Sequence, residues 1–177
     1  MRKWLIGLGL LLLMLVSIPA FLLASGTTDS SSLRMLFNSM MGIAGPAANS
    51  DIVRQQYKVP DGFTLELYDA NLPRARFLLF TPSGDLLVSR PHSGDILLLG
   101  RDADGDGKPN ARATLIEGLE RPLGMDISDG WLYIAESNRV RRIRFDSDTG
   151  TVDGALETVV EGLTDNGNHW SKTIRIG

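Results

Sequence analysis

The chain contains no cysteine, and only two of its 177 residues are histidine. Without thiols it has no disulfide, no zinc–thiolate site and no cysteine nucleophile. An excess of positive charge is also missing, because the formal net charge is −3. A nucleic-acid-binding domain needs a basic face, so we expect no nucleic-acid partner.

Two common enzyme motifs are absent as well. No GxGxxG sequence stands between a strand and a helix, which excludes the usual dinucleotide-binding fingerprint. No GxSxG elbow is present, which excludes the usual serine hydrolase motif. These two motif-based interpretations are therefore excluded.

Charge is missing from residues 4–24, an apolar run of 21 residues that follows Arg2 and Lys3. Such a leader predicts export across a membrane. The run exceeds the roughly 7–15 residues of a cleavable signal and approaches the ~20 that span a bilayer. We expect residues 1–24 to be a signal anchor or a cleaved signal peptide. The basic start places the N-terminus in the cytoplasm and the folded part in the periplasm, with residues 4–24 anchored in the inner membrane if they are retained.

Residues 25–54 are predicted to link this leader to the folded domain. Four apolar residues in the segment follow the spacing of one helix face: Leu33, Leu36, Phe37 and Met40. They predict a short amphipathic helix. One interpretation is contact with the membrane surface; the other is a helix packed on the domain, or a plain linker.

Beyond residue 55, one pattern repeats at a spacing of 47 and then 49 residues, with Phe80, Ile127 and Ile176 in equivalent places. In the first two repeats, a leucine stands eight residues earlier, at Leu72 and Leu119. In the third, Leu163 precedes Ile176 by thirteen residues, so five residues are inserted there. Short apolar runs repeated at this length are typical of β-propeller blades.

The repeats divide into short strands separated by Gly, Asp and Pro turns, with no helical period after residue 50. The predicted strands are 64–68, 77–81, 85–89, 95–99, 113–116, 124–127, 132–135, 140–145, 158–160 and 173–176. Four such strands make one blade. Residues 55–177 are therefore predicted to be an all-β, incomplete β-propeller of a little over two blades. Because propellers close into rings, we expect the chain to be a piece of a longer protein.

His169 is the first candidate catalytic residue, since it lies in the insertion that enters the third repeat, beside Asn168 and Trp170. Loops entering the innermost strand line the central mouth of a propeller, and a histidine there can accept a proton from a hydroxyl near neutral pH. The alternative is a histidine that only hydrogen-bonds its loop. His92, in a tract between two strands, is interpreted as a turn residue.

Asp102, Asp104 and Asp106 alternate with small residues between the predicted third and fourth strands. This spacing is typical of the first half of a calcium-binding loop, in which the three carboxylates supply oxygen ligands. The twelfth position is Ala113 rather than glutamate, so the loop is not a complete EF-hand. Either a structural calcium binds here, or the three aspartates are solvated turn residues.

Four arginines gather on one predicted strand: Arg139, Arg141, Arg142 and Arg144. A basic stripe attracts anionic partners. The interpretation that we favour is a solvated face of an edge strand, where charge discourages pairing with other chains.

Five segments, in this order, resemble the pyrroloquinoline-quinone (PQQ)-dependent sugar dehydrogenases, in particular the L-sorbosone or aldose dehydrogenase branch. They are 80–90 (FTPSGDLLVSR), 93–96 (SGDI), 102–107 (DADGDG), 117–125 (EGLERPLGM) and 167–177 (GNHWSKTIRIG). The resemblance implies a six-bladed propeller with PQQ over its mouth, a calcium ion, a sugar substrate and an electron acceptor of the respiratory chain.

The same resemblance implies that His169 is the base that takes a proton from a sugar hydroxyl while hydride passes to the quinone. Asn168, where relatives can carry an acidic residue, is expected to orient it. The groups that hold the PQQ carboxylates come from later blades in that family, so the resemblance assigns no cofactor-binding residue here and implies that the chain is inactive alone. Two alternatives stay open: a non-catalytic propeller that binds a protein or glycan, and a lactonase-type hydrolase with a central calcium.

Overall fold

The computed structural model describes residues 30–41, 49–167 and 169–177. The chain divides into two compact units, residues 1–47 and 48–177, which are described separately. The predicted leader, residues 1–24, lies outside the described residues. Within the described ranges, no helix combines the length and the apolar character that crossing a bilayer requires.

In the first unit, helix α2 (Ser30–Met41) occupies the segment whose apolar spacing predicts a helix. Phe37 and Met40 from that spacing are exposed, as is Met35.

The second unit begins with a short helix that the sequence did not predict, α3 (Ser50–Gln56). Asn49 caps it, because its side-chain oxygen accepts a hydrogen bond of 2.8 Å from the backbone N–H of Ile52. Asp51 in the first turn and Arg54 in the last turn complement the helix dipole. The sequence shows no helical period after residue 50, and α3 does not alter that observation, since seven residues are too few to display a period.

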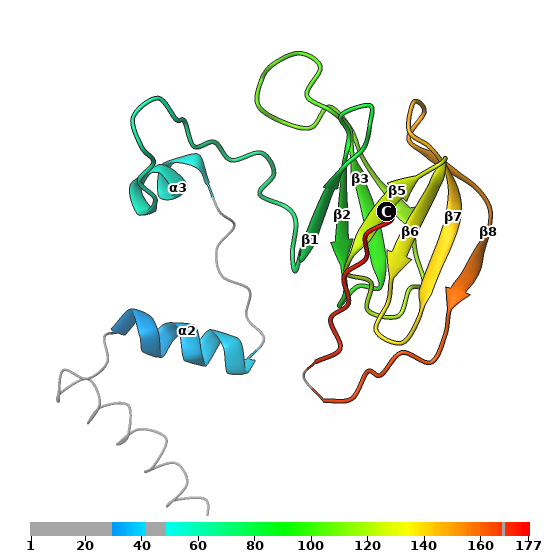
Figure 1. The fold of residues 1–177 in the computed structure, drawn as a ribbon. Coiled ribbons are helices and arrows are strands. Elements are labelled where there is room, and N and C mark those ends of the chain that lie inside the picture. Colours follow the sequence, from blue (N-terminus) through cyan, green and yellow to red (C-terminus); the bar gives the residue numbers. More distant parts are fainter. Residues whose placement is uncertain (1–29, 42–48, 168) are drawn as a thin grey trace, which may run out of the picture. The chain divides into compact units, whose positions relative to one another are not determined.

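The remainder of this unit is two four-stranded antiparallel sheets (Figure 1). Sheet A has the order β1-β2-β3-β4, and sheet B has the order β5-β6-β7-β8. The strands are β1 (Phe77–Phe80), β2 (Leu86–Arg90), β3 (Asp95–Leu99), β4 (Arg112–Ile116), β5 (Met125–Ser128), β6 (Trp131–Ala135), β7 (Val140–Asp146) and β8 (Thr151–Val160). Two successive antiparallel meanders of four strands confirm the all-β prediction and are the arrangement of part of a propeller.

Two predicted strands are not strands in the structure. Residues 64–68 do not pair with a sheet; instead Tyr68, together with Leu72 and Ala75, packs against the apolar residues on one face of sheet A. Residues 173–176 form no backbone ladder, and the N–H of Ile176 donates to a side chain, the carboxylate of Asp126. Apolar alternation alone did not distinguish a paired strand from an extended segment held by side chains.

The core lies mainly between the two sheets. Side chains alternate along each strand, so Leu87 and Ile96 of sheet A face Leu132 and Ile134 of sheet B, and all four are fully buried. Burying one such side chain stabilises the fold by about 1.5–3 kcal/mol. A second buried cluster covers the other face of sheet A and consists of Leu86, Val88, Leu97 and Leu99. Sheet A is therefore covered on both faces.

The first strands of successive repeats lie side by side. Strand β1 contacts β5, and the C-terminal segment runs beside β5, where the N–H of Gly124 donates a 3.0 Å hydrogen bond to the carbonyl of Lys172. In Figure 1, this segment is red and ends near β5. The equivalent residues Phe80, Ile127 and Ile176 thus belong to three neighbouring segments, as inner strands of successive blades do.

Candidate functional site

A cavity of about 530 Å³ opens at one end of the sheets. We call it the mouth cavity; its lining residues are Arg74, Arg76, Pro91, His92, Arg121 and Trp170. They come from the lead-ins to β1 and β5, from the β2–β3 turn and from the inserted loop. These segments share one end because β1 begins where β2 ends, with Phe77 paired to Ser89.

Three of the lining residues occupy the same position in the repeat. Arg74, Arg121 and Trp170 each stand six residues before the equivalent residues Phe80, Ile127 and Ile176. Both arginines have a left-handed backbone, with φ of 60° at Arg74 and 49° at Arg121. This conformation is uncommon for a residue with a Cβ atom, and strained backbone is typical of functional sites. The repeat therefore delivers one side chain from each lead-in to the same cavity.

Arg121 is held by neighbours on two sides. Its Nη2 atom lies 2.7 Å from the Asp165 carboxylate, and its guanidinium carbon lies 5.5 Å from the ring centre of Trp170. The second distance is within the range of a cation–π contact. Asp165 also accepts a 3.0 Å hydrogen bond from the Ser137 hydroxyl, which connects the inserted loop to sheet B.

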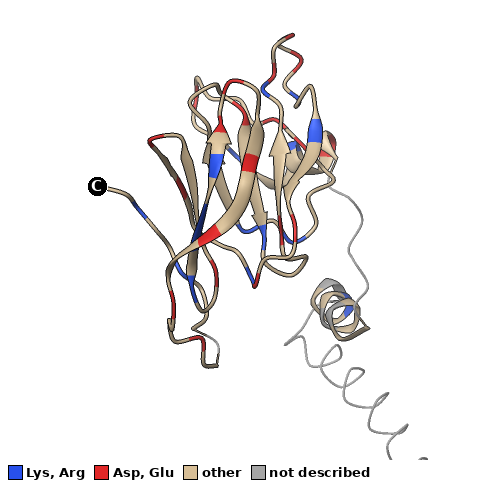
Figure 2. Ribbon diagram, turned by 90° about the vertical axis from the view of Figure 1, so that its right-hand side faces the viewer, with Lys and Arg blue, Asp and Glu red and all other residues tan. Residues whose placement is uncertain are grey.

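The electrostatic character of the mouth cavity is basic. Three guanidiniums and one imidazole line it, and among the described lining residues there is no carboxylate. Figure 2 shows acidic and basic residues interspersed over the strands and loops, so this local excess is not a property of a whole face. Arginine stays charged and binds planar carboxylates through paired N–H groups. The mouth cavity is therefore suited to an anion, especially a carboxylate.

The two histidines stand in different relations to the mouth cavity. His92 lies in the β2–β3 turn as expected, yet it also lines the mouth cavity. His169 is exposed and is not among the lining residues, although its neighbour Trp170 is. The carbonyls of both His169 and Trp170 accept hydrogen bonds from Lys172 Nζ, at 3.4 and 3.2 Å. Asn168 lies outside the described residues. The structure thus brings the inserted loop to the cavity without placing the imidazole inside it.

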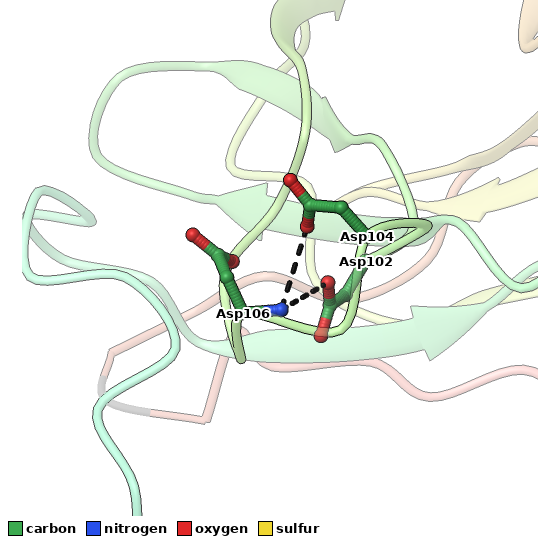
Figure 3. A group of neighbouring side chains, drawn as sticks. All are labelled: Asp102, Asp104 and Asp106. Carbon is green, nitrogen blue, oxygen red and sulfur yellow. Dashed lines mark hydrogen bonds between the residues drawn. The ribbon is translucent and has the colours of Figure 1, made fainter.

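Asp102, Asp104 and Asp106 come together in the β3–β4 loop (Figure 3). One carboxylate oxygen from each lies within 4.8 Å of the others, which is close enough to share a cation. The loop leaves sheet A where Leu99 pairs with Leu86, at the end opposite to the mouth cavity. A cation here would stabilise the loop and would not contact a ligand in the mouth cavity.

The Asp102 carboxylate also organises its own loop. It accepts backbone hydrogen bonds from Gly107, Gly105 and Asp106 at 2.9, 2.8 and 3.1 Å. These bonds favour the charged form, and the bond from Gly107 contributes most to lowering the pKa of Asp102. The carboxylate therefore stays ionised near neutral pH, as a calcium ligand must be.

The arginine stripe is not the face of an edge strand, so that prediction was wrong. Strand β7 lies between β6 and β8. Arg139 and Arg141 pair with Glu136, whose side chain is fully buried. The guanidinium carbons of Arg142 and Arg144 lie 4.1 and 3.8 Å from the ring centre of Trp131. The stripe is engaged in contacts within its own sheet.

Sequence reasoning missed Arg74, Arg76 and Arg121. The signal was present, because Arg74 and Arg121 are 47 residues apart, the same spacing as Phe80 and Ile127. Trp170 is their equivalent when residues are counted back from Ile176, as Arg74 is counted back from Phe80. Counting forward from Leu163 arrives at Asp165 instead, because the insertion intervenes.

Comparison with known proteins identifies a family and two kinds of similar solved structure. A family model described as TrAA12-like matches residues 57–177. Two solved structures of Trichoderma reesei Carbohydrate-Active Enzymes Family AA12, a calcium and an iodide structure, are each 31% identical, with a TM-score of 0.56 over 64% of this chain and 29% of theirs. No curated protein sequence matches.

The holo form of the pyranose dehydrogenase PQQ domain from Coprinopsis cinerea is 21% identical, with a TM-score of 0.51 over 58% of this chain and 24% of that one. At this identity the likeness concerns the fold. The chain spans less than a third of the length of each of these structures.

Proposed function

Because this chain belongs to the TrAA12-like family, we propose that it forms part of a six-bladed, PQQ-dependent sugar dehydrogenase. The observation that carries the proposal is the mouth cavity, where Arg74, Arg76 and Arg121 converge with His92. The solved relatives add support, since one is named as a holo PQQ domain of a pyranose dehydrogenase and another as a calcium structure.

The lining residues fit the proposed cofactor. PQQ is a planar quinone with three carboxylates, and its recognition requires several cations around one flat space. The cavity volume of about 530 Å³ is within the range of small-molecule sites. Arg74, Arg76 and Arg121 would hold carboxylates through their guanidiniums, and the Trp170 ring would lie beside a flat ligand. When bound, PQQ supplies a two-electron acceptor for hydride, and the protein supplies orientation and proton transfer.

We assign the proton transfer to His169. Its imidazole is exposed and stands next to Trp170 in the chain, so the inserted loop that lines the mouth cavity also carries a base. A neutral imidazole nitrogen accepts the proton of a sugar hydroxyl. Asn168 is the neighbour on the other side, and we assign it to orienting His169. Catalytic contacts tighten in many enzymes only when substrate is bound.

The proposed substrate and electron acceptor are those implied by the resemblance of the sequence to the PQQ-dependent sugar dehydrogenases. The proposed location rests on the leader, and the proposed calcium site rests on the spacing of the three aspartates. The substrate is an aldose or an L-sorbosone-like aldehyde, and the electrons pass to an acceptor of the respiratory chain. The protein is exported to the periplasm, with residues 4–24 as a signal or as an anchor. Calcium binds Asp102, Asp104 and Asp106 as a structural ion.

A lactonase-type hydrolase with a central calcium is not favoured. Such a site needs carboxylates or amides facing the mouth, whereas the three clustered aspartates lie at the opposite end of sheet A. A basic mouth repels a divalent cation. The other alternative is a non-catalytic binding module, which the following experiment would favour if the chain does not bind PQQ.

The test is a titration of the chain with PQQ, monitored by calorimetry and by quenching of tryptophan fluorescence. We expect saturable binding that Arg74→Gln weakens about tenfold or more, because a charge-assisted hydrogen bond contributes about 1.5–3 kcal/mol. Arg101→Gln is the matched control, since Arg101 is an exposed arginine beyond the opposite end of β3. Equal affinity of Arg74→Gln and the unmodified chain would contradict the proposal. So would the absence of saturable binding, which leaves the binding-module alternative.

A further inference from the structure

The inserted loop is attached to sheet B close to where it begins. Asp165, two residues after Leu163, contacts Arg121 at 2.7 Å and the hydroxyl of Ser137 at 3.0 Å. Five residues later, Trp170 returns to the same guanidinium, 5.5 Å from its carbon atom. The Arg121 guanidinium therefore lies between a carboxylate near the start of the loop and an indole near its end.

The repeat shows why a carboxylate stands at this place. Counted forward from the lead-in leucines, Asp165 is equivalent to Arg74 and Arg121, since each stands two residues after Leu72, Leu119 or Leu163. The third repeat thus has an acid where the first two have arginine. The five-residue insertion moves Trp170 into the cavity position and leaves Asp165 behind it, against Arg121.

The contact is only partly open to solvent. The side chains of Asp165 and Arg121 are 31% and 38% exposed, so both are partly shielded from solvent. The other carboxylate near this guanidinium, Glu120, is 53% exposed and lies 3.5 Å from Nε. Asp165 is therefore the closer and less exposed partner. The backbone of Arg121 is also in a left-handed turn, with φ of 49°. The contact of Nη2 with Asp165 therefore constrains where the remaining N–H groups of the guanidinium point.

We propose that Asp165 is a positioning residue of the mouth cavity, which orients Arg121 toward a bound anion and holds the inserted loop so that Trp170 stays beside that guanidinium. The inference rests on the proposed function for the identity of the anion. The arrangement of Asp165, Arg121 and Trp170 itself can be measured without any ligand.

The ligand-free test uses fluorine NMR of the chain labelled with 5-fluorotryptophan. Trp170→Phe identifies the signal of Trp170, and the signal of Trp131, which contacts Arg142 and Arg144 instead, reports that sheet B is intact. We expect Asp165→Ala to shift or broaden the Trp170 signal and to leave the Trp131 signal in place. Asp165→Glu should restore the Trp170 signal in part, and the control Glu120→Gln should leave it unchanged.

The ligand test uses the direction of the change in PQQ affinity. Removing a negative charge beside a basic cavity strengthens anion binding if Asp165 acts only through its charge. A positioning role predicts the reverse. The affinity of Asp165→Ala for PQQ should fall about three- to tenfold, because Arg121 loses its orientation. In an Arg121→Gln background, Asp165→Ala should have no further effect, since the residue through which it acts is gone.

The outcomes separate this inference from the proposed function. If PQQ binds and Asp165→Ala leaves its affinity unchanged or raises it, the positioning role is overturned. If the unmodified chain does not bind PQQ, the proposed function fails and the fluorine signals alone decide the inference. An unchanged Trp170 signal in both Asp165→Ala and Asp165→Asn then overturns it.

Discussion

The backbone N–H of Ile176 donates a 2.6 Å hydrogen bond to the carboxylate of Asp126, fifty residues earlier in the chain. Asp126 is buried in β5, and its other oxygen accepts from the Arg175 guanidinium at 3.3 Å. The equivalent position in the first repeat is Leu79, which packs against the core between the sheets. A buried carboxylate in the second repeat therefore holds the entry to the third, in place of a backbone ladder.

Gly124 is predicted to be essential for this contact. A Cβ atom at residue 124 would lie 2.7 Å from Thr173 Cα and 2.9 Å from the carbonyl oxygen of Lys172, and both are backbone atoms that cannot rotate away. We expect Gly124→Ala to release the C-terminal segment at a cost of about 1–3 kcal/mol. Faster hydrogen exchange of the Ile176 amide measures the release. Gly177→Ala is the control, since nothing lies near its added methyl group. Unchanged protection of Ile176 would contradict the prediction.

Glu136 is predicted to stabilise sheet B as the buried partner of two arginines. It is fully buried, accepts a 2.6 Å hydrogen bond from the backbone N–H of Glu120, and pairs with Arg139 and Arg141. Glu136→Gln leaves Arg141 without a counter-charge, which we expect to cost roughly 3–5 kcal/mol. Urea unfolding measures the change in the free energy of unfolding.

The matched control for Glu136→Gln is Glu157→Gln. Glu157 pairs with Arg142 at 3.0 Å but is 51% exposed, so its loss should cost less than about 1 kcal/mol. Similar unfolding midpoints for the two variants would show that burial of Glu136 does not carry the effect.

The β3–β4 loop should loosen in acid. The pKa of Asp102 is lowered by hydrogen bonds from its loop, first that of Gly107, so the charged form stabilises the folded loop. This stabilisation is complete above the ordinary aspartate pKa of about 4 and is lost as pH falls through the lowered folded value. We expect the amide signals of Gly105 and Gly107 to be constant from about pH 7 to pH 5 and to move below about pH 4. Asp102→Asn should abolish that transition, and its persistence in this variant would assign it to another group.

Calcium is expected to act on the same loop. Titration of the chain should move the amide signals of residues 102–107 and leave the Trp170 signal unchanged, because the loop lies at the far end of sheet A from the mouth cavity. Asp104→Asn should weaken calcium binding about tenfold or more, since it removes a charged ligand. Asp148→Asn, in another exposed turn, serves as the control. A calcium response centred on Trp170 would instead locate the ion at the mouth.

His169→Ala is expected to remove sugar oxidation without affecting PQQ binding. General base catalysis contributes roughly 100- to 10,000-fold, so turnover of an aldose with PQQ, calcium and a dye should fall by at least that lower factor when the chain is assembled with the remaining blades of the proposed propeller. His92→Ala is the comparison, because His92 lines the cavity and should change the affinity for PQQ more than the turnover. Retained turnover in His169→Ala would exclude it as the base.

Much of the fold was predictable because strand alternation and turn residues are local signals. Strand β3 has the predicted bounds, Asp95–Leu99. Strand β8 is longer than predicted, since it begins at Thr151, and Gly154 within it has a left-handed φ of 77° beside a register shift. A strand interrupted by a bulge loses its alternation, so the pattern showed only its last residues. The interpretation of β7 as an edge strand had a different origin, since it rested on the row of arginines alone.

The site was less predictable because it depends on which turns share one end of the sheets. His92 and Arg121 are about thirty residues apart and meet only because antiparallel meanders return each turn to the same end. The three aspartates, by contrast, lie within five residues of one another, so their clustering was visible in the sequence. Local clusters can be found by spacing, whereas a cavity assembled from several lead-ins requires the topology.

Arg74 and Arg121 each occupy a left-handed turn that leads into a sheet, and both side chains line the mouth cavity. Neither arginine belongs to the two buried clusters, so exchanging its side chain alters ligand chemistry without removing a core contact. Under the proposed function, specificity could therefore change at one repeat at a time, while the buried clusters of the two sheets keep their contacts.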